Sequence, residues 1–195
     1  LRGYCDQVIF APDSAEARET EVDVVFCATP DGVGQTVAPV EVAAGRRVVD
    51  YSGDFRFNSE ALYREYATRI ARDPVHKAPG LLGESVYGLT ELHRDRVRKA
   101  RVVGNPGCFA MSCICGLWPA VQHGLVETEG ICCDCKTGVS GGGKKPAAGF
   151  HFPERYENTN AYRLTGHQHV MEIERELGLL AGRVRARSPS RVDAR

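Results

Sequence analysis

The chain has 195 residues, of which 43% are hydrophobic and 26% are charged, a composition typical of a globular protein. Its 25 lysines and arginines balance its 25 aspartates and glutamates, so its net charge gives no sign of a nucleic-acid or anionic-membrane partner. No apolar run is long enough to span a bilayer, and the first residues lack the pattern of a signal peptide. We therefore expect a cytoplasmic protein with neither kind of partner.

The eight cysteines lie mostly in apolar runs and suit neither a disulfide framework nor a zinc site. A disulfide scaffold would concentrate them in a shorter chain. Cys113 and Cys115, like Cys133 and Cys135, lack the two-residue gap that is typical of structural zinc ligands. We expect reduced thiols and no metal ion.

Apolar runs and helical patterns alternate along the chain. The predicted elements are strand 22–28, helix 35–44, strand 47–50, helix 59–72, basic helix 93–99, strand 101–104, helix 108–123, strand 129–137 and helix 170–177. Strand, helix and strand at this spacing predict parallel βαβ units with right-handed crossovers, and hence an α/β protein.

The remaining stretches are predicted to be loops or are weakly patterned. Residues 8–10 suggest the end of a strand, and residues 13–21 suggest a short helix or a loop. Prolines and glycines make residues 73–92 loop-like. The composition changes over residues 122–128, where we place a domain boundary.

Cys108 follows a short apolar run and the chain-breaking triplet Asn105-Pro106-Gly107, at the predicted start of a helix. Unpaired N–H groups and the helix dipole favour an anion at such a position, so a thiol there is biased toward the nucleophilic thiolate. The alternative is a small cysteine that packs in a strand–helix turn.

Two later motifs also contain groups that bind or react. Gly138-Val-Ser-Gly-Gly-Gly143 with Lys144 and Lys145 fits a backbone nest for a phosphate, or a flexible hairpin tip. It is neither a Walker loop nor a Rossmann fingerprint. His167 and His169 precede a helix, and either could be a general base or an ordinary surface residue.

Asp50, Asp54 and Arg56 lie at the carboxyl end of a predicted parallel strand, where α/β folds bind ligands. Arg56 could bind a carboxylate or phosphate, or form a salt bridge that fixes the loop. An activated cysteine, a histidine, a phosphate nest and a parallel sheet together favour a reductase that forms a thioester from an acyl phosphate. They also fit a cysteine acyltransferase.

Asn105-Pro-Gly-Cys-Phe109, followed by Gly116-Leu-Trp-Pro119, resembles the active-site signature of the N-acetyl-γ-glutamyl-phosphate reductases of arginine biosynthesis. Six further blocks occur in that family's order, so the resemblance covers residues 22–177. They are Phe26-Cys-Ala-Thr-Pro-Asp-Gly32, Val49-Asp-Tyr-Ser-Gly-Asp-Phe-Arg56, Tyr87-Gly-Leu-Thr-Glu-Leu92, Thr137-Gly-Val-Ser-Gly-Gly-Gly143, Asn160-Ala-Tyr162 and Gly166-His-Gln-His169.

The resemblance implies two partial domains and a tail. Residues 1–124 would be part of an NADP-binding Rossmann domain that ends in the helix of the catalytic cysteine. Residues 125–182 would be part of an α+β domain with catalytic residues and the subunit contacts of a homo-oligomer. Residues 183–195 would be an aberrant basic tail.

The resemblance also implies roles for single residues. Cys108 would attack the γ-carbonyl of N-acetylglutamyl phosphate and release phosphate, and NADPH would reduce the thioester to the semialdehyde. His169, or alternatively His167, would be the acid/base.

Four weaker assignments follow from the same resemblance. Ser140 and Gly141 would lie against the cofactor or phosphate. Arg56 and Tyr162 would line the substrate pocket.

Three departures from the family pattern qualify these expectations. The glycine-rich pyrophosphate turn does not precede Leu1, Met111 replaces the usual threonine, and residues 183–195 are arginine-rich. We expect a fragment with little or no reductase activity of its own. The alternatives are a related aminoadipyl or aspartyl phosphate reductase, an inactive remnant, or a cysteine/histidine metal-binding module. Pro106-Gly107 argues against the aspartyl enzyme.

Overall fold

A four-stranded parallel sheet lies at the centre of the computed structural model, which describes residues 21–143, 145–164 and 166–180. Its strands are β1 (Val24–Cys27), β2 (Arg47–Asp50), β3 (Val86–Tyr87) and β4 (Val102–Gly104), in the order β1-β2-β4-β3. All three strand pairings are parallel. The predicted α/β class and parallel sheet are therefore confirmed.

Helices connect these strands and extend the fold beyond the sheet. They are α2 (Gly34–Ala43), α3 (Glu60–Arg69), α4 (Pro79–Glu84), α5 (Thr90–Lys99), α6 (Cys108–Gln122), α7 (Phe152–Arg155) and α8 (Val170–Leu180), with 3₁₀ turns η1 (Val139–Gly142) and η2 (Ala148–Phe150). The predicted cap of α3 is confirmed, because the Ser59 hydroxyl accepts a hydrogen bond from the Leu62 amide.

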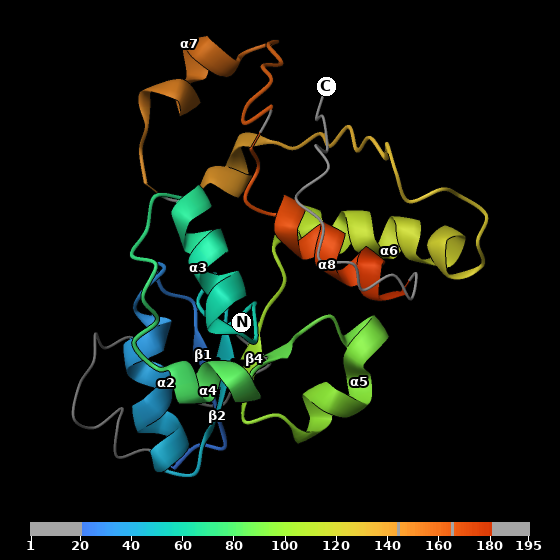
Figure 1. Cartoon of the computed structure of the whole chain (residues 1–195). Helices are drawn as coiled ribbons and strands as arrows, with labels where there is room; N and C mark the ends of the chain where they lie inside the picture. The colour runs from blue at the N-terminus through green and yellow to red at the C-terminus, as the bar shows by residue number, and fades with distance from the viewer. Residues whose placement is uncertain (1–20, 144, 165, 181–195) are drawn as a thin grey trace, which may run out of the picture.

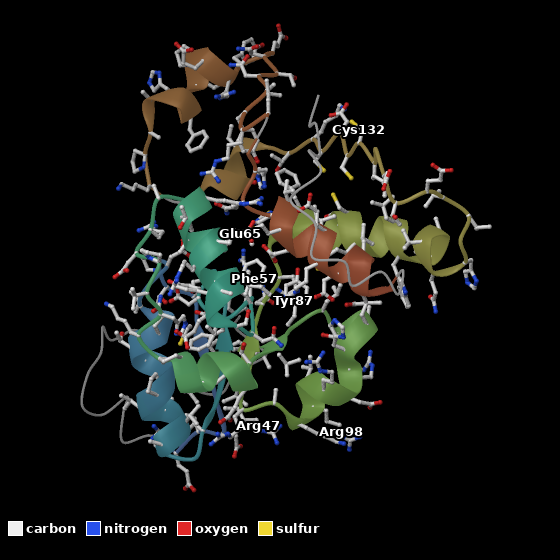
Figure 2. All side chains as sticks on the ribbon, viewed as in Figure 1. Arg47, Phe57, Glu65, Tyr87, Arg98 and Cys132 are labelled. Carbon is white, nitrogen blue, oxygen red and sulfur yellow. The ribbon has the colours of Figure 1, made fainter. Side chains whose placement is uncertain are left out.

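Two apolar clusters hold these elements together. One joins the sheet to α2, α3 and α4 through buried side chains that include Val48, Phe55 and Leu82. The other joins α6 to α8, which lie side by side in Figure 1. Phe57 and Tyr87, which Figure 2 labels near α8, are buried. Arg47, Glu65 and Arg98 are exposed. The α6–α8 contact brings the last described helix back against a helix from the middle of the chain.

The prediction of a loop over residues 73–92 was wrong for three segments. Pro79 begins α4, because proline suits the first turn of a helix, where its missing N–H would be unpaired anyway. Val86 and Tyr87 are extended because they pair with β4, a tertiary contact that local sequence does not encode. Helix α5 begins at Thr90, earlier than the predicted start at His93, and it is kinked at His93.

The predicted strand over residues 129–137 was also wrong. Residues 131–138 are neither helix nor paired strand in the part of the chain that the structure describes, and a strand requires a paired neighbour. In Figure 1 this segment leaves the end of α6, runs back past the helix and continues toward α7. The predicted helix at residues 170–177 is confirmed as α8.

Some sequence predictions concern residues outside the described ranges, namely 8–10, most of 13–21 and the basic tail 183–195. Among the residues that the structure describes, no helix combines the length and apolar character that a bilayer crossing requires.

Candidate active site

Cys108 is the first residue of α6 and is exposed. The strand β4 ends at Gly104, and Asn105-Pro106-Gly107 turns the chain into the helix. Gly107 occupies the N-cap position, and no side chain caps the helix there. The first-turn amides of α6 therefore remain available to an anion beside the Cys108 thiol.

His169 packs directly against this turn. A β-carbon on Gly107 would lie 2.2 Å from Nε2 of His169, so only glycine leaves room for the imidazole. His169 is 5% exposed, and its Nδ1 has no hydrogen-bond partner among the described residues. Burial, followed by the positive charges of Arg56, His167 and Arg163, lowers the pKa of His169 to about 3. The imidazole is thus neutral near pH 7.

Aromatic rings surround the turn on the side of His169. Phe109 contacts His167 with a centroid distance of 5.3 Å, and Tyr162 contacts the same histidine at 5.9 Å. The rings of His167 and His169 lie 4.7 Å apart. The Tyr162 ring also lies 6.5 Å from that of Phe109, the residue after Cys108. The structure therefore gathers four of the predicted site residues: Cys108, Tyr162, His167 and His169.

A fully buried carboxylate, Glu172, supports the same turn from α8. Its Oε2 accepts hydrogen bonds from the Gly107 amide at 3.0 Å and from the Tyr87 hydroxyl at 2.8 Å. Its Oε1 forms a 3.1 Å ion pair with Arg56. Burial, and next the charge of Glu172, raises the pKa of Tyr87, so the phenol keeps the proton that it donates. Glu172 therefore connects β3, the Cys108 turn and Arg56 to α8.

Arg56 makes further contacts within the protein. Its Nε donates to the Asn105 carbonyl at 2.9 Å, and a terminal nitrogen donates to the Tyr51 carbonyl at 3.1 Å. With the Glu172 pair, all three guanidinium nitrogens have acceptors. This geometry favours the salt bridge that fixes the loop, the second of the two roles considered for Arg56 from sequence.

Sequence reasoning did not assign a role to Glu172. The residue lies three positions after His169, so both project from the same side of α8 at its start. A glutamate in a helical pattern normally faces water, and this one would be assigned to the surface. The spacing of His169 and Glu172 was the one available signal.

Two acidic residues, one at the end of β2 and one shortly after it, accept hydrogen bonds within the protein. The Asp54 carboxylate accepts from the Gly32 amide at 2.8 Å and from the Gln35 amide at 3.2 Å. It therefore fills the N-terminus of α2 with a protein anion. Asp50 accepts from the Ser52 hydroxyl at 2.7 Å, and burial raises its pKa to about 6.

The resemblance implies a dinucleotide cofactor, which α/β folds bind at the carboxyl edge of the sheet. Because Asp54 occupies the α2 N-terminus, a pyrophosphate does not fit there. The Thr29 hydroxyl, just after β1, is buried and has no hydrogen-bond partner among the described residues. This orphaned group, at the carboxyl edge where α/β sheets bind cofactors, fits a polar group of such a ligand.

The two residues predicted to touch the cofactor, Ser140 and Gly141, lie in the exposed 3₁₀ turn η1. This turn packs through Gly142, where a β-carbon would come within 2.5 Å of the Phe150 ring. Lys144 lies outside the described residues. The contacts of the turn are therefore local, unlike those of the Cys108 turn.

Comparisons with known proteins agree with this geometry. The chain matches two family models, "Semialdehyde dehydrogenase, NAD binding domain" over residues 2–100 and "Semialdehyde dehydrogenase, dimerisation domain" over residues 108–188. The second match begins at Cys108.

Curated relatives named N-acetyl-gamma-glutamyl-phosphate reductase are also similar. The protein of Symbiobacterium thermophilum is 46% identical over 83% of this chain and 45% of its own length. That of Herminiimonas arsenicoxydans is 41% identical over 93% of this chain and 51% of its own length. That of a Bacillus cereus strain is 42% identical over 83% of this chain and 46% of its own length. The chain thus spans about half the length of these relatives. Together with the parallel sheet and the Cys108 turn, these matches establish that the chain belongs to the semialdehyde dehydrogenase family.

Proposed function

We propose that this chain contributes the nucleophile and its supporting residues to an NADP-dependent N-acetyl-γ-glutamyl-phosphate reductase. One observation carries the proposal: the neutral imidazole of His169 packs against the helix turn that presents Cys108. The names of the relatives supply the substrate, N-acetylglutamyl 5-phosphate.

The reaction begins at the Cys108 sulfur. The thiolate attacks the acyl carbon, a C–S bond forms, the bond to the phosphate oxygen breaks, and inorganic phosphate leaves. Free amides at the start of α6 stabilise the negative charge on the carbonyl oxygen. His169, or alternatively His167, would accept the thiol proton and return it in the reduction step, because the negative charge of the bound acyl phosphate would offset the positive charges that lower the pKa of His169.

The second half of the reaction converts the thioester to the 5-semialdehyde. A bound NADP cofactor would supply the hydride, and Thr29, Ser140 and Gly141 would hold that cofactor. Tyr162 borders the acyl group from the ring cluster, and Arg56 acts mainly by holding the Cys108 turn. The family model for a dimerisation domain supports a homo-oligomer as the assembled form.

Acylation of Cys108 tests the proposal without the cofactor. The chain is mixed with N-acetylglutamyl phosphate, released phosphate is measured, and the protein is mapped by mass spectrometry. We expect one N-acetylglutamyl adduct on Cys108, sensitive to neutral hydroxylamine, with one phosphate released per adduct. Cys108→Ser should abolish both signals, and Cys132→Ser, at another exposed cysteine, should leave them unchanged.

Other outcomes distinguish the remaining functions. Equal phosphate release by Cys108→Ser would exclude Cys108 as the nucleophile. Faster acylation by aspartyl or aminoadipyl phosphate would replace the substrate but keep the mechanism. The described residues contain no group of three His, Cys, Asp or Glu side chains placed to hold an ion. Stoichiometric zinc in the purified chain, lost in Cys133→Ser, would support the metal-binding alternative.

A further inference from the structure

Two cysteines that the proposed chemistry does not use meet between α6 and the segment 131–137. The Sγ atoms of Cys113 and Cys135 lie 3.5 Å apart, although the two residues are 22 positions apart in the sequence. Cys133 packs against the apolar cluster that contains Cys113. Figure 2 shows sulfur atoms beside Cys132, between this segment and α6. The Cys113–Cys135 contact thus joins a packed helix to a mostly exposed segment that has no strand ladder.

The two closest sulfurs differ in their access to solvent. Cys113 is buried within the α6–α8 cluster, and Cys135 is exposed. Burial, and next the neighbouring thiols, raises the pKa of Cys113. A solvent oxidant therefore meets Cys135 first, and Cys113 stands directly behind it.

The backbone around Cys113 and Cys135 allows their sulfur atoms to come within bonding distance. A disulfide bond is about 2.05 Å long, so the sulfurs must close by about 1.5 Å. Helix α6 is anchored to α8 by Ile114, Ile173 and Leu177. The segment with Cys135 has no strand ladder in the described structure, so it can move toward the helix without breaking one.

We propose that Cys113 and Cys135 form a reversible disulfide that cross-links α6 to the segment leading into the glycine turn η1. A peroxide oxidises the Cys135 thiol to a sulfenic acid and is itself reduced to water. The Cys113 sulfur then attacks the sulfenic sulfur, the S–O bond breaks, and a second water leaves. A dithiol reductant reverses the reaction by thiol–disulfide exchange and becomes a cyclic disulfide.

The proposed disulfide would join two segments of the protein and would not involve the Cys108 thiol. Cys113 lies five residues along α6 from Cys108, which places the two side chains about 140° apart around the helix. Cys135 lies only three residues before Gly138, which precedes η1. Oxidation would therefore tie the glycine turn to the helix of the nucleophile. The inference stands on this geometry and does not depend on the proposed reaction.

Peptide mapping of the oxidised chain tests the disulfide. The reduced chain is treated with one equivalent of hydrogen peroxide, blocked with N-ethylmaleimide, and digested with trypsin plus an endoproteinase that cleaves at Glu and Asp. Cleavage at Glu129, Asp134 and Lys136 separates the peptides of Cys113, Cys133 and Cys135. We expect a cross-linked peptide pair that contains Cys113 and Cys135 and disappears after dithiothreitol.

Single substitutions identify the partners. Cys135→Ser and Cys113→Ala should remove this pair, and Cys132→Ser and Cys108→Ser should retain it at the parent's yield. Because Cys135 is exposed, its substitution leaves folding intact even if Cys113→Ala unfolds the chain. A cross-link of equal yield in Cys135→Ser, or no cross-linked pair in the parent, would overturn the proposal.

Thermal unfolding gives an independent readout. The closed loop restricts the unfolded chain, so oxidation should raise the melting temperature of the parent by several degrees and that of Cys135→Ser by less than one degree. An equal rise in both proteins would contradict a Cys113–Cys135 bond.

Discussion

Two glycine-containing turns were expected at the site, and the structure treats them differently. The Cys108 turn is held by β4, Arg56, His169 and Glu172, and Gly107 itself is buried. The turn at Ser140 and Gly141 is exposed, and no described residue between positions 122 and 163 is buried. Glycines in a turn are therefore not enough to hold it in the interior, and buried partners from other elements are also required.

The difference comes from long-range partners. Glu172 reaches Gly107 across 65 positions of sequence, Tyr87 across 85 and Arg56 across 116. Each hydrogen bond is buried, where losing one partner leaves another polar group unpaired. The η1 turn has mainly local contacts, so changes there should cost little.

The largest effect should follow removal of the buried carboxylate. Glu172→Gln places an amide donor against the donors of Arg56, Tyr87 and Gly107, and leaves the buried guanidinium uncompensated. We expect a loss of about 3–5 kcal/mol in the free energy of unfolding. Urea unfolding followed by the fluorescence of Trp118, the single tryptophan, measures it.

The matched control for that change is Glu154→Gln on the exposed helix α7. It should change the free energy of unfolding by less than about 0.5 kcal/mol. Similar losses in both variants would mean that the Glu172 network does not stabilise the turn.

An added methyl group compares the two glycine turns directly. Gly107→Ala must displace the His169 imidazole, since the new carbon would lie 2.2 Å from Nε2. We expect a loss of about 2–3 kcal/mol and slower acylation of Cys108. In Gly141→Ala the new carbon would lie 3.5 Å from the Thr137 hydroxyl, an ordinary contact, so stability should change by less than about 0.5 kcal/mol. Equal costs would remove the distinction between the turns.

A smaller effect should appear in the pH dependence of stability. The pKa of His169 is about 3 in the folded chain and its ordinary value is 6.5, so between these values the unfolded state binds more protons. Stability should therefore fall as the pH is lowered through this window. From pH 7 to pH 5, the contribution of His169 is about 1–2 kcal/mol.

The comparison of the parent with His169→Gln isolates that contribution. Other groups titrate in the same range, including Asp50, whose pKa burial raises to about 6 and whose effect has the opposite sign. Urea unfolding at pH 7 and pH 5 should show a smaller loss in the variant than in the parent. Identical losses would mean that His169 does not remain neutral in the folded chain.

The sequence by itself determined the elements that local signals specify. Apolar runs gave β1, β2 and β4, the Ser59 cap marked the start of α3, and Asn-Pro-Gly placed Cys108 at the start of α6. These assignments succeeded because strand periodicity, capping and chain breaking act within a few residues.

Only the tertiary structure decided which polar groups meet. It placed His169, rather than His167, against Gly107, it buried Glu172 beneath the turn, and it paired the short strand β3 with β4. It also left residues 131–138 without a ladder, although their sequence is compatible with a strand. A charged residue in a helical pattern is buried, and an alternating run forms a strand, only when a distant segment supplies the partner. Local sequence does not identify that partner.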